Sequence, residues 1–180
     1  MRKVLPHFTT CGNLASGFLS LLFAASGDFL YATTFVVASA VLDSLDGAIA
    51  RDGGCEGRLA EFGKNLDSLA DVVSFGAAPA FAAYVAGMNT VPAVGILGCL
   101  AFFVCGALRL ARFPLVDDPR HFVGLPIPPA GLFVSILTAL GTPPLPMLAA
   151  LAATSALMVS AVPFPKPATL LGRKKTPGDG

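Results

Sequence analysis

Apolar residues dominate the chain in long stretches, and short breaks rich in Gly and Pro separate these stretches. A transmembrane helix needs about 20 mostly apolar residues, whereas a membrane β-barrel needs period-two alternation, which is weak here. The pattern therefore predicts an all-α, polytopic membrane protein with six transmembrane helices, at residues 12–27, 29–50, 63–87, 91–112, 126–141 and 144–163. We expect one membrane domain over residues 1–165 and a basic, disordered cytoplasmic tail over residues 166–180.

Composition agrees with this interpretation. Of 180 residues, 54% are hydrophobic and 13% are charged, and the mean hydropathy is +0.74, values that a soluble domain with a wetted surface does not tolerate. The net charge of +1 provides no overall field that would attract nucleic acid. The four cysteines form neither a CxxC pair nor a Cys/His cluster, so we expect no disulfide framework and no zinc site; they are Cys11, Cys55, Cys99 and Cys105.

The first apolar stretch has a second interpretation. Arg2 and Lys3 precede an apolar run that ends in small residues near Ser26, as in a cleavable signal peptide. Pro6, His7 and Asn13 interrupt that pattern. We therefore expect the segment to stay in the protein as a transmembrane helix.

All twelve basic residues fall at one set of predicted helix ends. They are Arg2, Lys3, Arg51, Arg58, Lys64, Arg109, Arg112, Arg120, Lys166, Arg173, Lys174 and Lys175. The opposite connections, near residues 26–28, 87–90 and 141–144, contain no Lys or Arg. Because basic residues accumulate on the cytoplasmic side of short loops, both termini are expected in the cytoplasm and the protein in the cell membrane. The basic tail is expected to contact anionic lipid headgroups.

Four aspartates lie inside two predicted transmembrane helices. Asp43 and Asp46 are three residues apart and Asp67 and Asp71 are four apart, so each pair shares one helical face near the cytoplasmic boundary. An ionised Asp near the centre of a lone helix costs at least about 2.5 kcal/mol, so four together require a cation. All-oxygen ligands favour Mg²⁺ or Mn²⁺, and therefore phosphoryl chemistry. A structural cluster and an acid-lined cation transporter are the alternatives.

Nearby residues suit a phosphorylated ligand. Gly47 permits close approach of a ligand or of a neighbouring helix, and Arg51 lies about one turn beyond it. Arg109 and Arg112 share a face at the end of another predicted helix and could grip a phosphate or a carboxylate. Anchoring at the membrane interface explains the three arginines as well.

The aspartates belong to a longer pattern. It reads Asp43-x2-Asp46-Gly47-x2-Ala50-Arg51, followed by Gly63-x3-Asp67-x3-Asp71. This pattern resembles the signature of the CDP-alcohol phosphatidyltransferase family, except that residues 52–62 carry a three-residue insertion. Additional length in a loop costs little closure entropy, so we expect altered loop contacts rather than loss of activity.

Three further segments resemble the phosphatidylserine synthase branch of this family: residues 66–80, 106–113 and 122–128. Asn13 followed by Gly17 is similar to that branch as well. The resemblance implies transfer of the phosphatidyl group from CDP-diacylglycerol to the hydroxyl of L-serine, with phosphatidylserine and CMP as products. Glycerol 3-phosphate or an inositol phosphate remains open as the acceptor, and a homodimer is implied.

The resemblance also implies roles for individual residues. Asp43, Asp46 and Asp67 are expected to bind two Mg²⁺ or Mn²⁺ ions. Asp71 is expected to add a ligand and to act as general base. The CDP-lipid pocket is expected to include Asn13, Asp43, Gly47, Ala50 and Arg51. Ser74, Arg109 and Arg112 are expected at the acceptor or phosphate, although Ser74 could equally serve helix packing.

Overall fold

The computed structural model describes the backbone of residues 5–52, 58–112, 121–160 and 163–165. Side chains are described for residues 8–45, 61–112 and 124–160. Predictions about Cys55, Arg120 and the tail at residues 166–180 lie outside these ranges.

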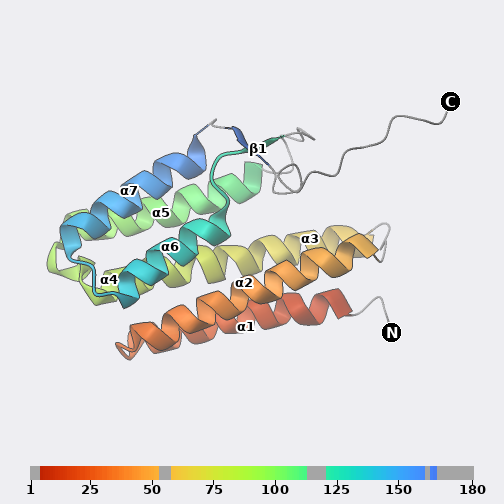
Figure 1. Ribbon diagram of the computed structural model, residues 1–180, viewed down its shortest axis with the longest axis horizontal. Coiled ribbons are helices and arrows are strands. Elements are labelled where there is room, and N and C mark those ends of the chain that lie inside the picture. The colour runs from red at the N-terminus through yellow and green to blue at the C-terminus, as the bar shows by residue number, and fades with distance from the viewer. Residues whose placement is uncertain (1–4, 53–57, 113–120, 161–162, 166–180) are drawn as a thin grey trace.

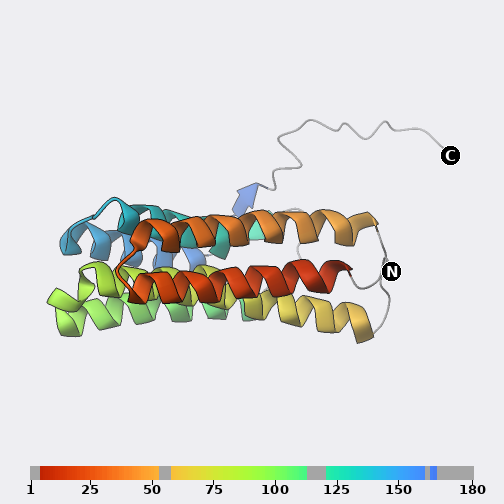
Figure 2. The same cartoon turned by 90° about the horizontal axis from the view of Figure 1, so that it is seen from below.

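The described chain is a bundle of roughly antiparallel helices (Figure 1). Its elements are α1 (Leu5–Ala25), α2 (Phe29–Asp52), α3 (Arg58–Asp71), the π-helix η1 (Val72–Ala77), α4 (Ala78–Ala86), the 3-10 helix η2 (Met88–Thr90), α5 (Pro92–Arg112), β1 (His121–Val123), α6 (Ile127–Ala139), α7 (Pro144–Val159) and β2 (Pro163–Pro165). α3, η1 and α4 follow one another without a break and form one long rod. α1 contacts both α2 and this rod (Figure 2).

The helical architecture is confirmed, but six membrane spans are not. Three described helical stretches are long and apolar enough to cross a bilayer: Phe8–Ala25, Glu61–Ala86 and Pro92–Arg112. Three shorter apolar helical stretches cover Phe29–Leu45, Ile127–Ala139 and Pro144–Val159. The 13 residues of α6 rise only about 20 Å, less than the bilayer core of about 30 Å.

Several predicted boundaries were wrong for local reasons. α1 begins at Leu5 rather than at residue 12, because Pro6 in the first helical turn removes only an N–H that has no intrahelical partner. α6 ends before Gly141, whose φ of 68° lies in the left-handed region. α7 ends at Val159 rather than at residue 163, because Ser160 is extended.

A short β-pair was not predicted. β1 and β2 pair antiparallel, with His121 opposite Pro165 and Val123 opposite Pro163. Beside them the N–H of Leu125 donates to the carbonyl of Leu157 at 3.0 Å. Proline has no N–H to contribute to a ladder, so a segment of this composition does not resemble a strand.

The distribution of polar and apolar side chains is that of a membrane protein. Leu30, Leu97 and Leu145 are 71%, 65% and 79% exposed, whereas Asn13 and Ser39 are fully buried. Apolar groups facing outward over the whole bundle are stable in lipid and unfavourable in water. The bilayer is therefore the solvent of this surface.

The π-helix η1 is held closely from two sides. A Cβ on Gly17 of α1 would lie 2.8 Å from the Cα of Ser74, and a Cβ on Gly131 of α6 would lie 2.5 Å from the carbonyl oxygen of Phe75. Phe75 is fully buried. Small residues at these two contacts allow the backbones to approach, as they do at packed helix interfaces in membranes.

We expect Gly131→Ala to destabilise the protein by about 1–3 kcal/mol, because the new methyl group would overlap the backbone of η1. Thermal unfolding in detergent measures the effect. Gly12→Ala is the matched control, since its Cβ would meet only the tip of the Leu42 side chain, at 3.3 Å. Equal melting temperatures for the two variants would show that η1 and α6 are not in close contact.

Candidate active site

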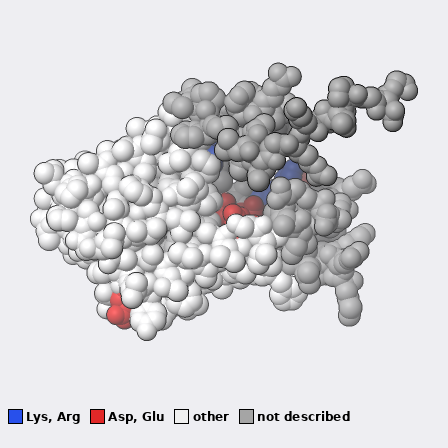
Figure 3. Space-filling view, viewed as in Figure 1, with Lys and Arg blue, Asp and Glu red and all other residues white. Residues whose placement is uncertain are grey.

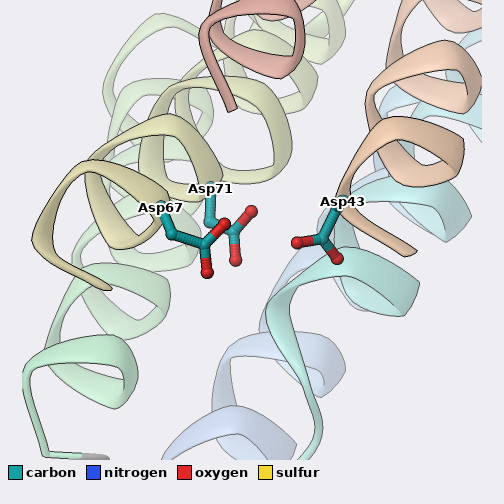
Figure 4. A group of neighbouring side chains, drawn as sticks. All are labelled: Asp43, Asp67 and Asp71. Atoms are coloured by element: carbon teal, nitrogen blue, oxygen red, sulfur yellow. The ribbon is translucent and has the colours of Figure 1, made fainter. Parts of the chain in front are cut away.

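Three aspartates from two helices converge near one end of the bundle. Asp43 projects from α2, and Asp67 and Asp71 project one turn apart from α3 (Figure 4). One carboxylate oxygen from each lies within 4.8 Å of the other two. Asp71 is only 7% exposed, and Asp43 and Asp67 are partly buried. Acidic atoms are visible in a recess on one face of the molecule (Figure 3).

Local structure explains why these side chains meet. The i,i+4 spacing places Asp67 and Asp71 above one another on α3, and α2 runs antiparallel to α3 (Figure 1). The π-helix begins at Val72, directly after Asp71. Single π-helical turns inside α-helices are frequent at functional sites, and here the turn changes the helical face immediately after the two aspartates.

The three carboxylates fit a hard divalent cation. All donor atoms are oxygens, the ligands that Mg²⁺ and Mn²⁺ prefer. Three ionised carboxylates this close repel one another strongly in an apolar bundle, and a divalent cation compensates their charge. Asp43, Asp67 and Asp71 are therefore the residues that could hold the metal.

Asn13 of α1 lies against this group. Its Nδ2 donates a hydrogen bond to Asp71 Oδ1 at 3.3 Å. Its backbone carbonyl accepts hydrogen bonds from the hydroxyls of Ser39 on α2, at 3.2 Å, and Ser74 in η1, at 3.0 Å. Asn13 thus connects three helices next to a candidate ligand.

The three residues predicted to bind the acceptor substrate differ in burial and in hydrogen bonding. Ser74 is fully buried and its hydroxyl is directed to Asn13. Arg109 is partly buried near the end of α5, close enough to Asp71 for their charges to interact, and its buried Nε has no hydrogen-bond partner among the described residues. Arg112 is exposed at the last residue of α5. The spacing in the sequence does not predict this difference in burial between the two arginines.

Four further predicted site residues lie in the last two turns of α2: Asp46, Gly47, Ala50 and Arg51. Their backbone continues the helix that carries Asp43. Their side chains lie outside the described part of the chain. Their predicted roles therefore stay predictions.

Two features of the site were missed in the sequence. One is the π-helix after Asp71, whose six residues do not interrupt the apolar pattern. The other is the bond from Asn13 to Asp71, across 58 positions in the sequence. The available signal for the second was Asn13 itself, the one amide side chain of a mostly apolar helix.

Comparison with known proteins assigns the chain to a family. The model of the CDP-alcohol phosphatidyltransferase family matches residues 3–165. The chain belongs to the CDP-alcohol phosphatidyltransferase family. The resemblance found in the aspartate pattern is thereby confirmed.

Individual CDP-alcohol phosphatidyltransferases are similar over most of the chain. A CDP-diacylglycerol–serine O-phosphatidyltransferase of Helicobacter pylori is 38% identical over 134 residues, which are 73% of this chain and 55% of the relative. The enzyme of the same name from Bacillus subtilis is 35% identical over 162 residues, covering 89% of each protein. An archaetidylserine synthase of Methanothermobacter thermautotrophicus is 37% identical over 164 residues, or 90% of this chain and 70% of the relative. The chain thus spans about half the length of the Helicobacter relative.

We expect Asp67→Asn to weaken Mn²⁺ binding by at least about tenfold, because a neutral amide replaces one of three converging carboxylates. Electron paramagnetic resonance of free Mn²⁺ over detergent-solubilised protein measures the binding. Asp28→Asn is the matched control, because Asp28 is exposed in the turn between α1 and α2, at the other end of the bundle. Equal Mn²⁺ affinity in the two variants would exclude a metal at this cluster.

Proposed function

We propose that the protein transfers the phosphatidyl group of CDP-diacylglycerol to the hydroxyl of L-serine, releasing phosphatidylserine and CMP. The observation that carries the proposal is the convergence of Asp43, Asp67 and Asp71 in a member of the CDP-alcohol phosphatidyltransferase family. The names of the similar proteins support serine as the acceptor, since each is a serine phosphatidyltransferase or an archaetidylserine synthase. Family analogy supports Asp46 as a further ligand.

The chemistry we propose takes the roles of the carboxylates from the family. The acceptor oxygen attacks the phosphorus of the phosphatidyl group, the bond from that phosphorus to the CMP oxygen breaks, and the hydroxyl proton passes to Asp71. Asp43, Asp46 and Asp67, with Asp71, are the residues that would hold two Mg²⁺ or Mn²⁺ ions. Such ions, when bound, neutralise charge on the diphosphate and on the departing CMP.

Arg109 is the residue we assign to the negatively charged part of a substrate. Its charge interacts with that of Asp71 and its buried Nε has no hydrogen-bond partner among the described residues, so a phosphate or the carboxylate of serine beside the aspartates would supply the missing acceptor. Ser74 is not assigned to the acceptor, because its hydroxyl already donates to Asn13. Gly47, Ala50 and Arg51 are assigned to the CDP-lipid pocket by the family pattern alone.

We place the site at the cytoplasmic side of the cell membrane. Lys64 lies in the first half of α3, and Arg109 and Arg112 lie in the last turn of α5, at the same end of the bundle as the aspartates. Positive charge marks the cytoplasmic side of membrane proteins. A cytoplasmic site also lets a water-soluble amino acid and CMP exchange with water while acyl chains stay in lipid. Residues 1–165 form the membrane domain in this proposal, and a homodimer is adopted from the family.

We expect CMP release from CDP-diacylglycerol in detergent to require Mg²⁺ or Mn²⁺ and to be at least about tenfold faster with serine than with glycerol 3-phosphate or inositol phosphate. Asp71→Asn should reduce the rate by at least about 100-fold, because general-base catalysis contributes about 10²–10⁴-fold. Its melting temperature should match that of the unmodified protein. Faster release with another acceptor would change the substrate, whereas cation flux across vesicles without CMP release would favour a transporter.

We expect Arg109→Ala to lower kcat/KM for serine by about 10- to 100-fold, because a hydrogen bond to a charged group contributes about 1.5–3 kcal/mol. Arg112→Ala is the matched control, since Arg112 is exposed on the same helix, and its kcat/KM should stay within about threefold. Steady-state CMP release at varied serine measures both. If the two arginine variants are equally impaired, Arg109 has no special contact with substrate.

A further inference from the structure

We propose that Asn13 is a positioning residue that orients the carboxylate of Asp71 and so sets both its metal-binding and its proton-accepting geometry. The inference rests on the proposed function for the second of these roles. Asn13 is fully buried in the middle of α1, and its Nδ2 is 3.3 Å from Asp71 Oδ1.

The direction of this hydrogen bond matters. An ionised carboxylate can only accept hydrogen bonds, so the amide nitrogen of Asn13 must face Asp71. A terminal carboxylate rotates with little hindrance about its last torsion, and a donor on Oδ1 restricts that rotation. The orientation of both Asp71 oxygens relative to Asp43 and Asp67 then depends on this donor.

The second atom of the amide supports a role beyond packing. Asn13 Oδ1 is buried and has no hydrogen-bond partner among the described residues. Buried polar atoms are nearly always hydrogen-bonded, and a residue serving only to fill space could be apolar. The unpartnered oxygen is the cost of turning the nitrogen toward Asp71.

The backbone of Asn13 carries a separate, structural function. Its carbonyl accepts the hydroxyls of Ser39 and Ser74, which join α1 to α2 and to η1. These two bonds do not depend on the side chain at position 13. Side-chain substitution therefore separates orientation of Asp71 from assembly of the three helices.

Asn13 was predicted to line the CDP-lipid pocket. With its side chain fully buried, it presents no surface to a lipid, so we assign it to Asp71 instead. It acts through that carboxylate and is not itself a catalytic residue.

The test compares Asn13→Leu and Asn13→Asp with Ser39→Ala. Leu has a similar size and no donor; Asp keeps the shape but places a carboxyl group against Asp71. Both should lose about 10- to 100-fold in kcat for CMP release, with KM for CDP-diacylglycerol and serine within about threefold. Ser39→Ala removes a hydroxyl from the same carbonyl and should keep its kcat within about threefold. If Asn13 had only a structural role, Asn13→Asp would keep its kcat, or Ser39→Ala would lose as much kcat as Asn13→Leu. Either result would overturn the proposal.

Mn²⁺ binding provides a measurement that does not need the transferase reaction. Its affinity should fall about tenfold in Asn13→Leu and stay unchanged in Ser39→Ala. If the unmodified protein releases no CMP with any acceptor, the proposed function fails while this measurement still decides the role of Asn13. Unchanged Mn²⁺ affinity in Asn13→Leu would overturn that role.

Discussion

Repulsion among three carboxylates is the constraint on which the site depends. One carboxylate oxygen from each lies within 4.8 Å of the other two, and Asp71 is only 7% exposed, so water screens their repulsion less than it would on the surface of a soluble protein. A cation that compensates the charge and helices that cannot move apart would together stabilise such an arrangement. All-oxygen donors suit a hard divalent cation. Close packing around α3 keeps the helices from moving apart.

That packing is concentrated at η1, immediately beyond the aspartates. Gly17 of α1 and Gly131 of α6 let two helices press on the π-helix from different sides, and Ser74 within it is tied to Asn13. Small residues and buried hydroxyls replace the hydrophobic driving force that is missing between helices in lipid. The same contacts that hold α1, α3 and α6 together therefore also fix the position of Asp71.

The sequence predicted the helices and the meeting of the aspartates because both depend on local periodicity. The spacing of four residues places Asp67 and Asp71 on one face of a helix. The antiparallel arrangement of the two predicted helices brings Asp43 close to them. The π-helix could not be predicted, since Val72–Ala77 has the same apolar composition as an α-helix. Equally, Arg109 and Arg112 share a motif and differ only in how far α5 buries them. What escaped prediction thus depends on tertiary contacts.

The short α6 supports the π-helix beside the site. α6 runs in the same direction as α3 (Figure 1), and its Gly131 lies at the level of Phe75. The first residue of α6 lies beside η1 too: a Cβ on Gly76 would lie 3.6 Å from Cδ1 of Ile127. α6 thus begins beside η1, which follows Asp71 directly in the chain. A helix extended in front of Ile127 would run back along α3, which carries Asp67 and Asp71, whereas the 13-residue α6 begins beside η1. One short helix therefore supports the π-helix that follows the aspartates without running beside them.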